Sequence, residues 1–385
     1  MREKRERLER NKMSEVRDGR DAPDPVLLPP CPALPAFRAF PAFLAFLALL
    51  MSGCQPAPGD PPAKTSRTLY YFTWSDYVHP DTMVEFERSA GVKVVVDTFS
   101  SNEELLAKLQ SGADGYDVTV PSDYMVSIMV HQGLLAELDL DRIPNVRMVA
   151  DRLQRLAFDP ENRHSIPYLW GTVGIGYDSA VIPSPPESWA ILWDPQYKGR
   201  ISMLNDQREV LGAALRSMRQ SLNTRDPAII GQAKDKLLAQ KALVKTYTSE
   251  NYDQLLASGE VVLAHGWGGA VARAMVERPS VRFVVPREGG TIWSDCLVVL
   301  KNSKNKELAM RFINFLLDRE VAARTTTRVL FASSNREAES LVKDRVRENP
   351  AIYTPDAVFA RLEWMTDVGK AIRLYDRAWT ELKMR

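Results

Sequence analysis

Tryptophan, tyrosine and acidic side chains recur in this sequence just after short runs of β-branched and aromatic residues. The groups follow the runs 68–73, 117–121, 200–204, 261–265 and 281–285. Their members are, in chain order, Trp74, Ser75, Asp76 and Tyr77, then Ser122 and Tyr124, then Asp206 and Glu209, then Trp267, and finally Trp293 and Asp295. Ligands of open α/β sheets bind outside the carboxyl ends of the strands, so five such ends with similar chemistry predict one shared site.

Aromatic faces and carboxylates together suit an organic polycation. A polyamine is a string of ammonium groups separated by methylenes: ring faces can bind its stems and cations, and carboxylates can bind its charged ends. An anion site would instead need Arg, Lys or a glycine-rich helix start. The pair Gly289 and Gly290 has no strand–helix fingerprint around it. The sequence therefore favours a bound cation.

The same residues also have purely structural interpretations. A single Trp or Tyr is more often a packing residue, and we expect Trp170, Trp189 and Trp193 to be of that kind. Asp206 and Glu209 are three residues apart, a spacing that also fits a helix N-cap with its capping partner. Only the repetition across several strand ends favours binding.

Strand-like and helix-like segments alternate along the chain, as an α/β fold requires. The predicted strands are 68–73, 92–98, 117–121, 200–204, 261–265, 281–285 and 296–300, and the predicted helices are 81–89, 102–110, 306–317 and 356–362. This pattern places Trp293 and Asp295 in the loop before the last strand.

Composition excludes several classes of protein. The chain has 385 residues, of which 45% are hydrophobic and 26% charged, enough for two lobes with a core each. The formal net charge is +1 with mixed signs, which gives no basis for nucleic-acid binding. The four histidines show no metal-ligand spacing and no nucleophile elbow is present, so we expect no metal, no cofactor and no enzyme activity. Cys296 beside Asp295 is expected to be a buried, unreactive thiol.

The N-terminal segment is typical of an exported lipoprotein. An apolar run at 42–51 is followed by Ser52, Gly53 and Cys54, which predicts a signal peptide over 1–53 and a lipidated Cys54. More than thirty residues precede the apolar run, so a start at Met13 or later stays open. The Pro-rich stretch 54–65 fits a tether. We therefore expect a periplasmic protein held at a membrane by a lipid anchor alone.

The chain resembles the spermidine/putrescine-binding proteins, the receptors of bacterial polyamine ABC transporters. The resemblance runs from about 69 to 385 and includes TWSDY (73–77), SNEELLAKL (101–109), YDVTVPS (116–122), SIPYLWGTVGIGYD (165–178), NDQREV (205–210), GEVVLAHGWGG (259–269), VPREGGTIWSD (285–295) and KNKELAMRFINFLL (304–317). It implies a two-lobe type II periplasmic binding protein fold with a ligand cleft between the lobes. It places lobe 1 at 66–173 and 294–337, and lobe 2 at 174–293 and 338–385.

The resemblance also implies a polyamine ligand, an ABC permease as partner and ten of the eleven site residues named above, all except Asp76. Asp295 resembles the family's central carboxylate for an ammonium group, and Trp74 and Trp267 resemble its stacking walls. Asp76 is an additional candidate. We expect the protein to be a monomer.

Three positions depart from the family pattern, at Phe331, Met365 and Ala270. Each lacks a polar group that some family members carry: a tyrosine hydroxyl, a glutamine and an acid, respectively. An indole at Trp293 is similar to the spermidine-type members, so spermidine is expected to be favoured over putrescine. A receptor of the same fold for another organic cation, or a polyamine sensor, stays open.

Overall fold

The computed structural model describes residues 68–77, 79–112 and 115–384, apart from the side chain of Asp76. These residues belong to one compact unit. The predicted signal peptide 1–53, the lipidation residue Cys54 and the tether 54–65 lie outside the described residues. No described helix combines the length and the apolar character needed to cross a lipid bilayer.

The described strands form one mixed sheet. Its main path has the order β2-β1-β3-β9-β4-β7-β5-β6, while β10 and β8 also pair with β4 and β11 pairs with β9. The strands are β1 (Thr68–Trp74), β2 (Lys93–Phe99), β3 (Val118–Thr119), β4 (Ser165–Asp178), β5 (Ile201–Met203), β6 (Val244–Tyr247), β7 (Leu263–Trp267), β8 (Val281–Val284), β9 (Thr291–Val299), β10 (Ala332–Ser333) and β11 (Glu363–Trp364).

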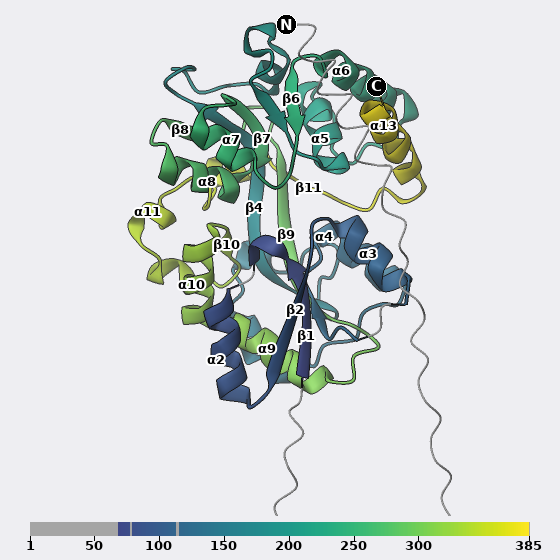
Figure 1. Cartoon of the computed structure of the whole chain (residues 1–385). Coiled ribbons are helices and arrows are strands. Elements are labelled where there is room, and N and C mark those ends of the chain that lie inside the picture. Colours follow the sequence, from purple (N-terminus) through teal and green to yellow (C-terminus); the bar gives the residue numbers. More distant parts are fainter. Residues whose placement is uncertain (1–67, 78, 113–114, 385) are drawn as a thin grey trace, which may run out of the picture. The chain divides into compact units, whose positions relative to one another are not determined.

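Two long strands, β4 and β9, connect the two lobes. The first part of β4, from Ser165 to Thr172, pairs antiparallel with β9, and the second part, from Val173 to Asp178, pairs with β7 and β8. Figure 1 shows both strands running from the part that contains β1 and β2 to the part that contains β7 and β8. All fourteen residues of β4 are buried. Residues on these strands are therefore placed where the two lobes meet.

Helices pack against the sheet in both lobes (Figure 1). The longer ones are α2 (Pro80–Ala90), α3 (Asn102–Gln110), α4 (Asp123–His131), α5 (Gln207–Ser217), α6 (Pro227–Gln240), α7 (Tyr252–Ser258), α8 (Gly268–Glu277), α9 (Lys306–Leu316), α10 (Arg319–Val329) and α13 (Ile372–Met384). Short α-helices follow at α11 (Asp344–Arg347) and α12 (Asp356–Phe359). Several helices begin at a polar residue whose side chain accepts a backbone N–H: Ser101 before α3, Asp206 before α5, Asp226 before α6 and Asp318 before α10.

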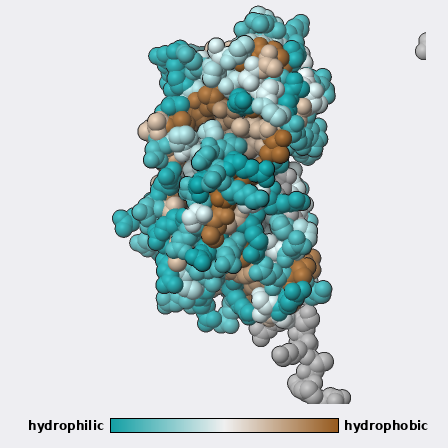
Figure 2. Space-filling view, turned by 90° about the vertical axis from the view of Figure 1, so that its left-hand side faces the viewer, coloured by the Kyte–Doolittle hydropathy of each residue, from teal (hydrophilic) through white to brown (hydrophobic). Residues whose placement is uncertain are grey.

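Apolar side chains are concentrated inside the molecule. Trp189, Tyr71 and Phe312 are among the largest side chains that are fully buried. On the face drawn in Figure 2, hydrophilic residues predominate and hydrophobic ones form small patches. Most large apolar side chains are thus buried in the core, and few are exposed to solvent.

Most of the strands and helices predicted from the sequence are present in the structure, with their ends shifted. The helix at 102–110 agrees with α3, and 68–73 and 92–98 correspond to β1 and β2. The predicted helix 356–362 is wrong in length, because α12 ends at Phe359. The strand predicted at 117–121 is shorter in the structure, where β3 covers only Val118–Thr119.

One correction concerns the site directly. The strand expected at 296–300 begins five residues earlier, so Trp293 and Asp295 lie inside β9 rather than in a loop. All nine residues of β9 are buried. A strand covered on both faces shows no polar–apolar alternation, so its polar beginning resembled a loop.

Candidate ligand-binding site

A cavity is lined by residues of both lobes. The lining residues are Trp74, Ser75, Tyr77, Ser100, Asn102, Ser122, Asp123, Tyr124, Asp206, Glu209, Ser249, Glu250, Trp267, Thr291, Trp293, Asp295, Phe331 and Met365. Ten of the eleven residues expected from the sequence are in this set. The eleventh, Asp76, belongs to the short 3-10 turn Ser75–Tyr77 (η1), and its side chain is outside the described atoms.

Asp295 is held by two hydroxyl groups from other elements of the fold. The Tyr77 hydroxyl donates to Oδ2 at 2.5 Å, and the Ser122 hydroxyl donates to Oδ1 at 2.6 Å. Ser122 is itself fixed by Asn102, which accepts from the Ser122 backbone N–H and donates to its Oγ, both at 3.0 Å. These bonds connect the turn after β1, the starts of α3 and α4 and the middle of β9. They fix the direction of the carboxylate before a ligand arrives.

The Asp295 carboxyl is 4% exposed and has no described cationic partner within ion-pair distance. Burial raises its pKa to about 6, and the hydrogen bonds from Ser122 and Tyr77 limit the rise because they favour the charged form. A buried carboxylate without a cation is costly. The arrangement is therefore suited to a ligand that brings a positive charge.

Asp206 and Glu209 form a second acidic group at the start of α5. Asp206 is the N-cap, and its Oδ1 accepts the backbone N–H of Glu209 at 2.9 Å. The Glu209 carboxylate instead accepts from the Thr291 hydroxyl of β9 at 2.8 Å. Burial and the neighbouring Asp206 raise the pKa of Glu209 to about 8. The capping interpretation is thus correct for Asp206, whereas the Glu209 side chain bonds Thr291 and does not act as a capping partner. Both residues line the cavity.

Three indole rings, those of Trp74, Trp267 and Trp293, line the same cavity as the two acidic groups. Trp74 at the end of β1 donates from Nε1 to the Val120 carbonyl at 2.8 Å, and Trp267 at the end of β7 has its backbone N–H bound to the Tyr252 hydroxyl at 3.0 Å. Both indoles remain half-buried. Trp293 on β9 is buried and lies edge-on to Phe331, with ring centroids 5.3 Å apart. Such faces can contact methylene stems and cations.

Tyr124 and Asp123 line the cavity from the first turn of α4. The Tyr124 hydroxyl donates to Glu103 of α3 at 3.1 Å. Asp123 is 1% exposed; its Oδ1 accepts the Tyr124 N–H at 2.7 Å, and its Oδ2 has no hydrogen-bond partner among the described atoms. Burial holds the pKa of Asp123 well above its usual range. Asp123 therefore adds a carboxyl to the cavity that the sequence-based site did not include.

Several lining residues that were not expected from the sequence also follow the ends of strands. Ser100 and Asn102 follow the end of β2, and Ser249 and Glu250 follow the end of β6. The strand at 92–98 was predicted, but its carboxyl end was not used, and β6 was not predicted. Applied to every strand of the sheet, the same rule indicates these positions.

The three departures from the family pattern lie at different places. Phe331 and Met365 both line the cavity. Ala270 is buried in the first turn of α8 and does not line it. The expectation that Ala270 removes a polar partner from the cavity wall is therefore not supported by its position.

Within the described part of the chain, no cluster of three or more His, Cys, Asp or Glu side chains has the grouping that a metal ion requires. His265 is fully buried, and burial lowers its pKa to about 3. Cys296 is a buried free thiol whose pKa burial raises well above its usual range, as expected for a packing residue.

Comparison with known proteins places this fold and cavity in a family. Residues 115–356 match the family described as bacterial extracellular solute-binding protein. The spermidine/putrescine-binding periplasmic protein 1 of Haemophilus influenzae is 36% identical over 324 residues, covering 83% of this chain and 90% of that protein. The putrescine-binding periplasmic protein PotF of Escherichia coli is 34% identical, covering 83% of this chain and 92% of that protein.

A solved structure shows the same relationship. A putative spermidine/putrescine ABC transporter protein from Listeria monocytogenes superposes with a TM-score of 0.80 at 34% identity, covering 83% of this chain and 99% of that one. The chain thus has the two-lobe solute-binding fold. It belongs to the bacterial extracellular solute-binding proteins and, within them, to the family of these periplasmic binding proteins. Members of this family are receptors that bind a solute, and the chain is a receptor of this kind rather than an enzyme.

Proposed function

We propose that this protein captures a polyamine outside the cytoplasm and delivers it to an ABC importer. The observation that carries the proposal is the Asp295 carboxylate, buried and aimed by Tyr77 and Ser122, in a cavity that holds the Asp206–Glu209 pair as a second acidic group. Two acidic groups in a cavity that is also lined by indole rings match a ligand with ammonium groups joined by a methylene stem. The names of the relatives agree with this ligand class.

Each site residue then has a role. Asp295 binds one ammonium group, and Asp206 with Glu209 binds another. The rings of Trp74, Trp267 and Trp293 contact the stem. The full proposed binding set is Trp74, Ser75, Asp76, Tyr77, Ser122, Tyr124, Asp206, Glu209, Trp267, Trp293 and Asp295, of which Asp76 rests on the sequence alone.

Within the polyamines, spermidine is the preferred ligand in this proposal. The large indole of Trp293, set against Phe331, extends the aromatic wall along a longer stem. Glu250 at the solvent-exposed rim offers a further carboxylate for a third ammonium. Phe331 and Met365 offer no hydroxyl or amide at their end of the cavity, which limits the preference.

The proposal also includes the location, the lipid anchor and the oligomeric state of the protein. The relatives are periplasmic, and we place this protein in the periplasm, tethered through lipidated Cys54 after removal of 1–53. It acts as a monomer, with lobe 1 at 66–173 and 294–337 and lobe 2 at 174–293 and 338–385. A permease docks on the closed, loaded form.

Equilibrium dialysis of the full chain against putrescine, cadaverine, spermidine and spermine tests the proposal. We expect saturable binding of at least one of them at micromolar concentration, without metal or nucleotide. Absence of binding for all four would overturn the assignment of the ligand class.

A further inference from the structure

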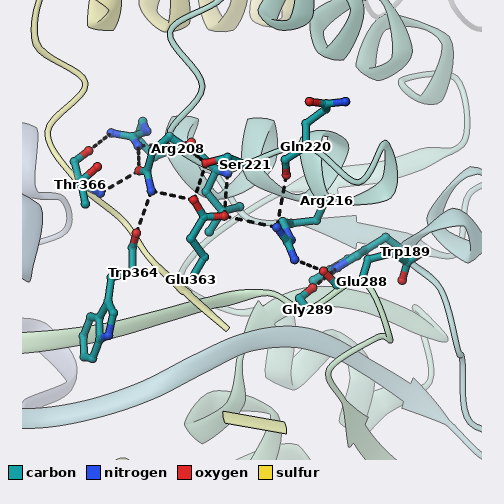
Figure 3. Close-up of polar contacts among 12 residues, drawn as sticks. Trp189, Arg208, Arg216, Gln220, Ser221, Glu288, Gly289, Glu363, Trp364 and Thr366 are labelled. Carbon is teal, nitrogen blue, oxygen red and sulfur yellow. Dashed lines mark hydrogen bonds and ion pairs between the residues drawn. The ribbon is translucent and has the colours of Figure 1, made fainter. Parts of the chain in front are cut away.

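A buried arginine stands between the two acidic residues in the sequence, at the start of α5. Arg208 is the residue between Gln207 and Glu209 in the first turn of α5, and it is 3% exposed. Its guanidinium donates to the Thr366 carbonyl at 3.2 Å and to Asn223 Oδ1 at 3.1 Å. Figure 3 shows this side chain extending toward Thr366. Arg208 does not line the cavity, so it has no direct part in ligand contact.

The charge of Arg208 is left without a direct ion pair. Oxygen atoms of backbone and amide groups accept its hydrogen bonds, and its guanidinium lies 4.9 Å from the Tyr375 ring centroid and 5.9 Å from that of Tyr124. No described carboxylate is within ion-pair distance of it. A buried cation without a partner is costly, just as a buried carboxylate is. The nearby carboxyls of the cavity are the negative charges that offset it.

The electrostatics of the cavity carboxyls agree with this arrangement. Burial raises the pKa of Asp123, Asp206 and Glu209, and the positive charge of Arg208 opposes the rise for each of them. The remaining titratable groups that face Arg208 are Tyr124 of α4, Tyr375 of α13 and Glu103 of α3. Burial and the charge of Asp206 raise the pKa of Glu103, the positive charge of Arg208 opposes the rise, and the Glu103 carboxylate accepts a hydrogen bond from the Tyr124 hydroxyl.

The surrounding polar contacts hold Arg208 in place. Asn223 donates to Glu363 at 3.0 Å and to the Trp364 carbonyl at 2.8 Å, and it accepts from the Thr366 N–H at 2.8 Å. Glu363 also pairs with Arg216, at 3.3 Å, near the end of α5 (Figure 3). The segment that contains Glu363 and Trp364 forms β11, which runs parallel to the start of β9 beside Thr291. The guanidinium is therefore held through Asn223 and the Thr366 carbonyl beside β11, which in turn pairs with the start of β9.

We propose that Arg208 is a positioning residue of the binding site, whose anchored guanidinium is the fixed counter-charge of the Asp206–Glu209 pair. In the empty receptor it favours the charged form of the pair, so that the pair can accept an ammonium group with less proton release. The inference rests on the proposed function for its ligand, but the effect on the pair itself exists without ligand.

The ligand-free test measures the acidic pair directly. Carboxyl ¹³C NMR titration of the full chain should show that Arg208→Gln raises the pKa of Glu209 by about one unit, as loss of a nearby opposite charge does. Arg208→Lys, which keeps the charge, should leave that pKa near the wild-type value. Arg216→Gln is the matched control, because it disturbs the same polar cluster from the same helix without removing charge beside the pair. An unchanged Glu209 pKa in Arg208→Gln, or an equal shift in Arg208→Lys, would overturn the inference.

The ligand-bound test uses spermidine and putrescine. Titration calorimetry at several pH values should show that the pH at which affinity is half lost moves up by about one unit in Arg208→Gln and stays in place in Arg208→Lys and Arg216→Gln. A general structural defect would instead lower affinity by the same factor at every pH, and that result would also overturn the inference. If the wild-type protein binds no polyamine at any pH, the proposed function fails while the NMR result still decides the role of Arg208.

Discussion

The Tyr77 hydroxyl donates a 2.5 Å hydrogen bond to the Asp295 carboxylate, although 218 residues separate them in the sequence. The turn after β1 and the middle of β9 are brought together by β3, which pairs with both strands. A buried carboxylate is thereby oriented by hydroxyl groups that favour its charged form. Ligand affinity should therefore depend strongly on this carboxylate.

Asp295→Asn should weaken spermidine binding by well over tenfold. Removing one partner of a desolvated charge pair costs about 2–5 kcal/mol, and each ~1.4 kcal/mol is a factor of ten. Titration calorimetry measures the change. Tyr77→Phe should have a smaller effect, since it removes a hydroxyl but keeps the charge. The exposed Asp356 supplies the control Asp356→Asn, and equal affinities in all three variants would contradict the role of Asp295.

Binding should weaken as the pH falls from about 8 to 6. The pKa of Glu209 is raised to about 8 and that of Asp295 to about 6, so each is protonated below its value and then lacks the charge that an ammonium requires. Ligand binding near neutral pH should therefore release protons. Calorimetry in buffers of different ionisation enthalpy counts them. Affinity that is constant over this range, with no proton release, would contradict the raised pKa values.

The empty protein should lose stability as the pH rises from about 4 to 7, through Asp295. The pKa of this group is about 6 when folded against an ordinary 3.8, so its charged form opposes folding by up to about 3 kcal/mol, at ~1.4 kcal/mol per unit. Asp295→Asn removes this effect. In urea unfolding, the stability of Asp295→Asn relative to wild type should therefore increase between pH 4 and pH 7. A difference that does not change with pH would show that the carboxyl is not perturbed by burial.

Trp293→Phe should reduce the preference for spermidine over putrescine by severalfold. The smaller ring shortens the aromatic wall beside Phe331 and loses cation–π contact, for which an indole is the best partner. Competition titrations of the two ligands give the ratio. Trp193→Phe, on a half-buried indole outside the cavity, is the matched control. A ratio that is unchanged, or a wild type that prefers putrescine, would overturn the assigned selectivity and leave the polyamine class intact.

Cys54 should be the lipid-modified first residue of the mature protein. The apolar run at 42–51 and the small residues Ser52 and Gly53 motivate this expectation. Mass spectrometry of the native protein, with Cys54→Ser as the control, decides it. An unmodified peptide spanning residues 50–60 as the dominant species would rule out lipidation.

The candidate site could be predicted from the sequence to the extent that strand ends could be recognised. β1, β5, β7 and β8 contain β-branched or apolar runs, and the last residues of β1 and β7, Trp74 and Trp267, line the cavity. Asp206 was identified as a site residue because it follows the predicted strand 200–204, and as a cap because of its spacing to Glu209, whose backbone N–H donates to it.

The strands β4 and β9 were harder to predict from the sequence because they are buried on both faces. β4 is buried at every position and contains Gly171, Gly174 and Gly176, so it shows neither alternation nor a compact β-branched run. Gly171 faces Trp293 closely enough that an added Cβ would lie 2.7 Å from the indole. The link between Arg208 and Thr366 joins residues 158 positions apart and follows from packing alone.

A crystal structure of the full chain grown with spermidine tests the central claim most directly. The account predicts one ligand nitrogen within about 3 Å of Asp295 and another at the same distance from Asp206 or Glu209, as in charge-assisted hydrogen bonds. The stem should lie against the faces of Trp74 and Trp267. Spermidine bound elsewhere, or bound in the cavity with its nitrogen atoms away from both acidic groups, would contradict it.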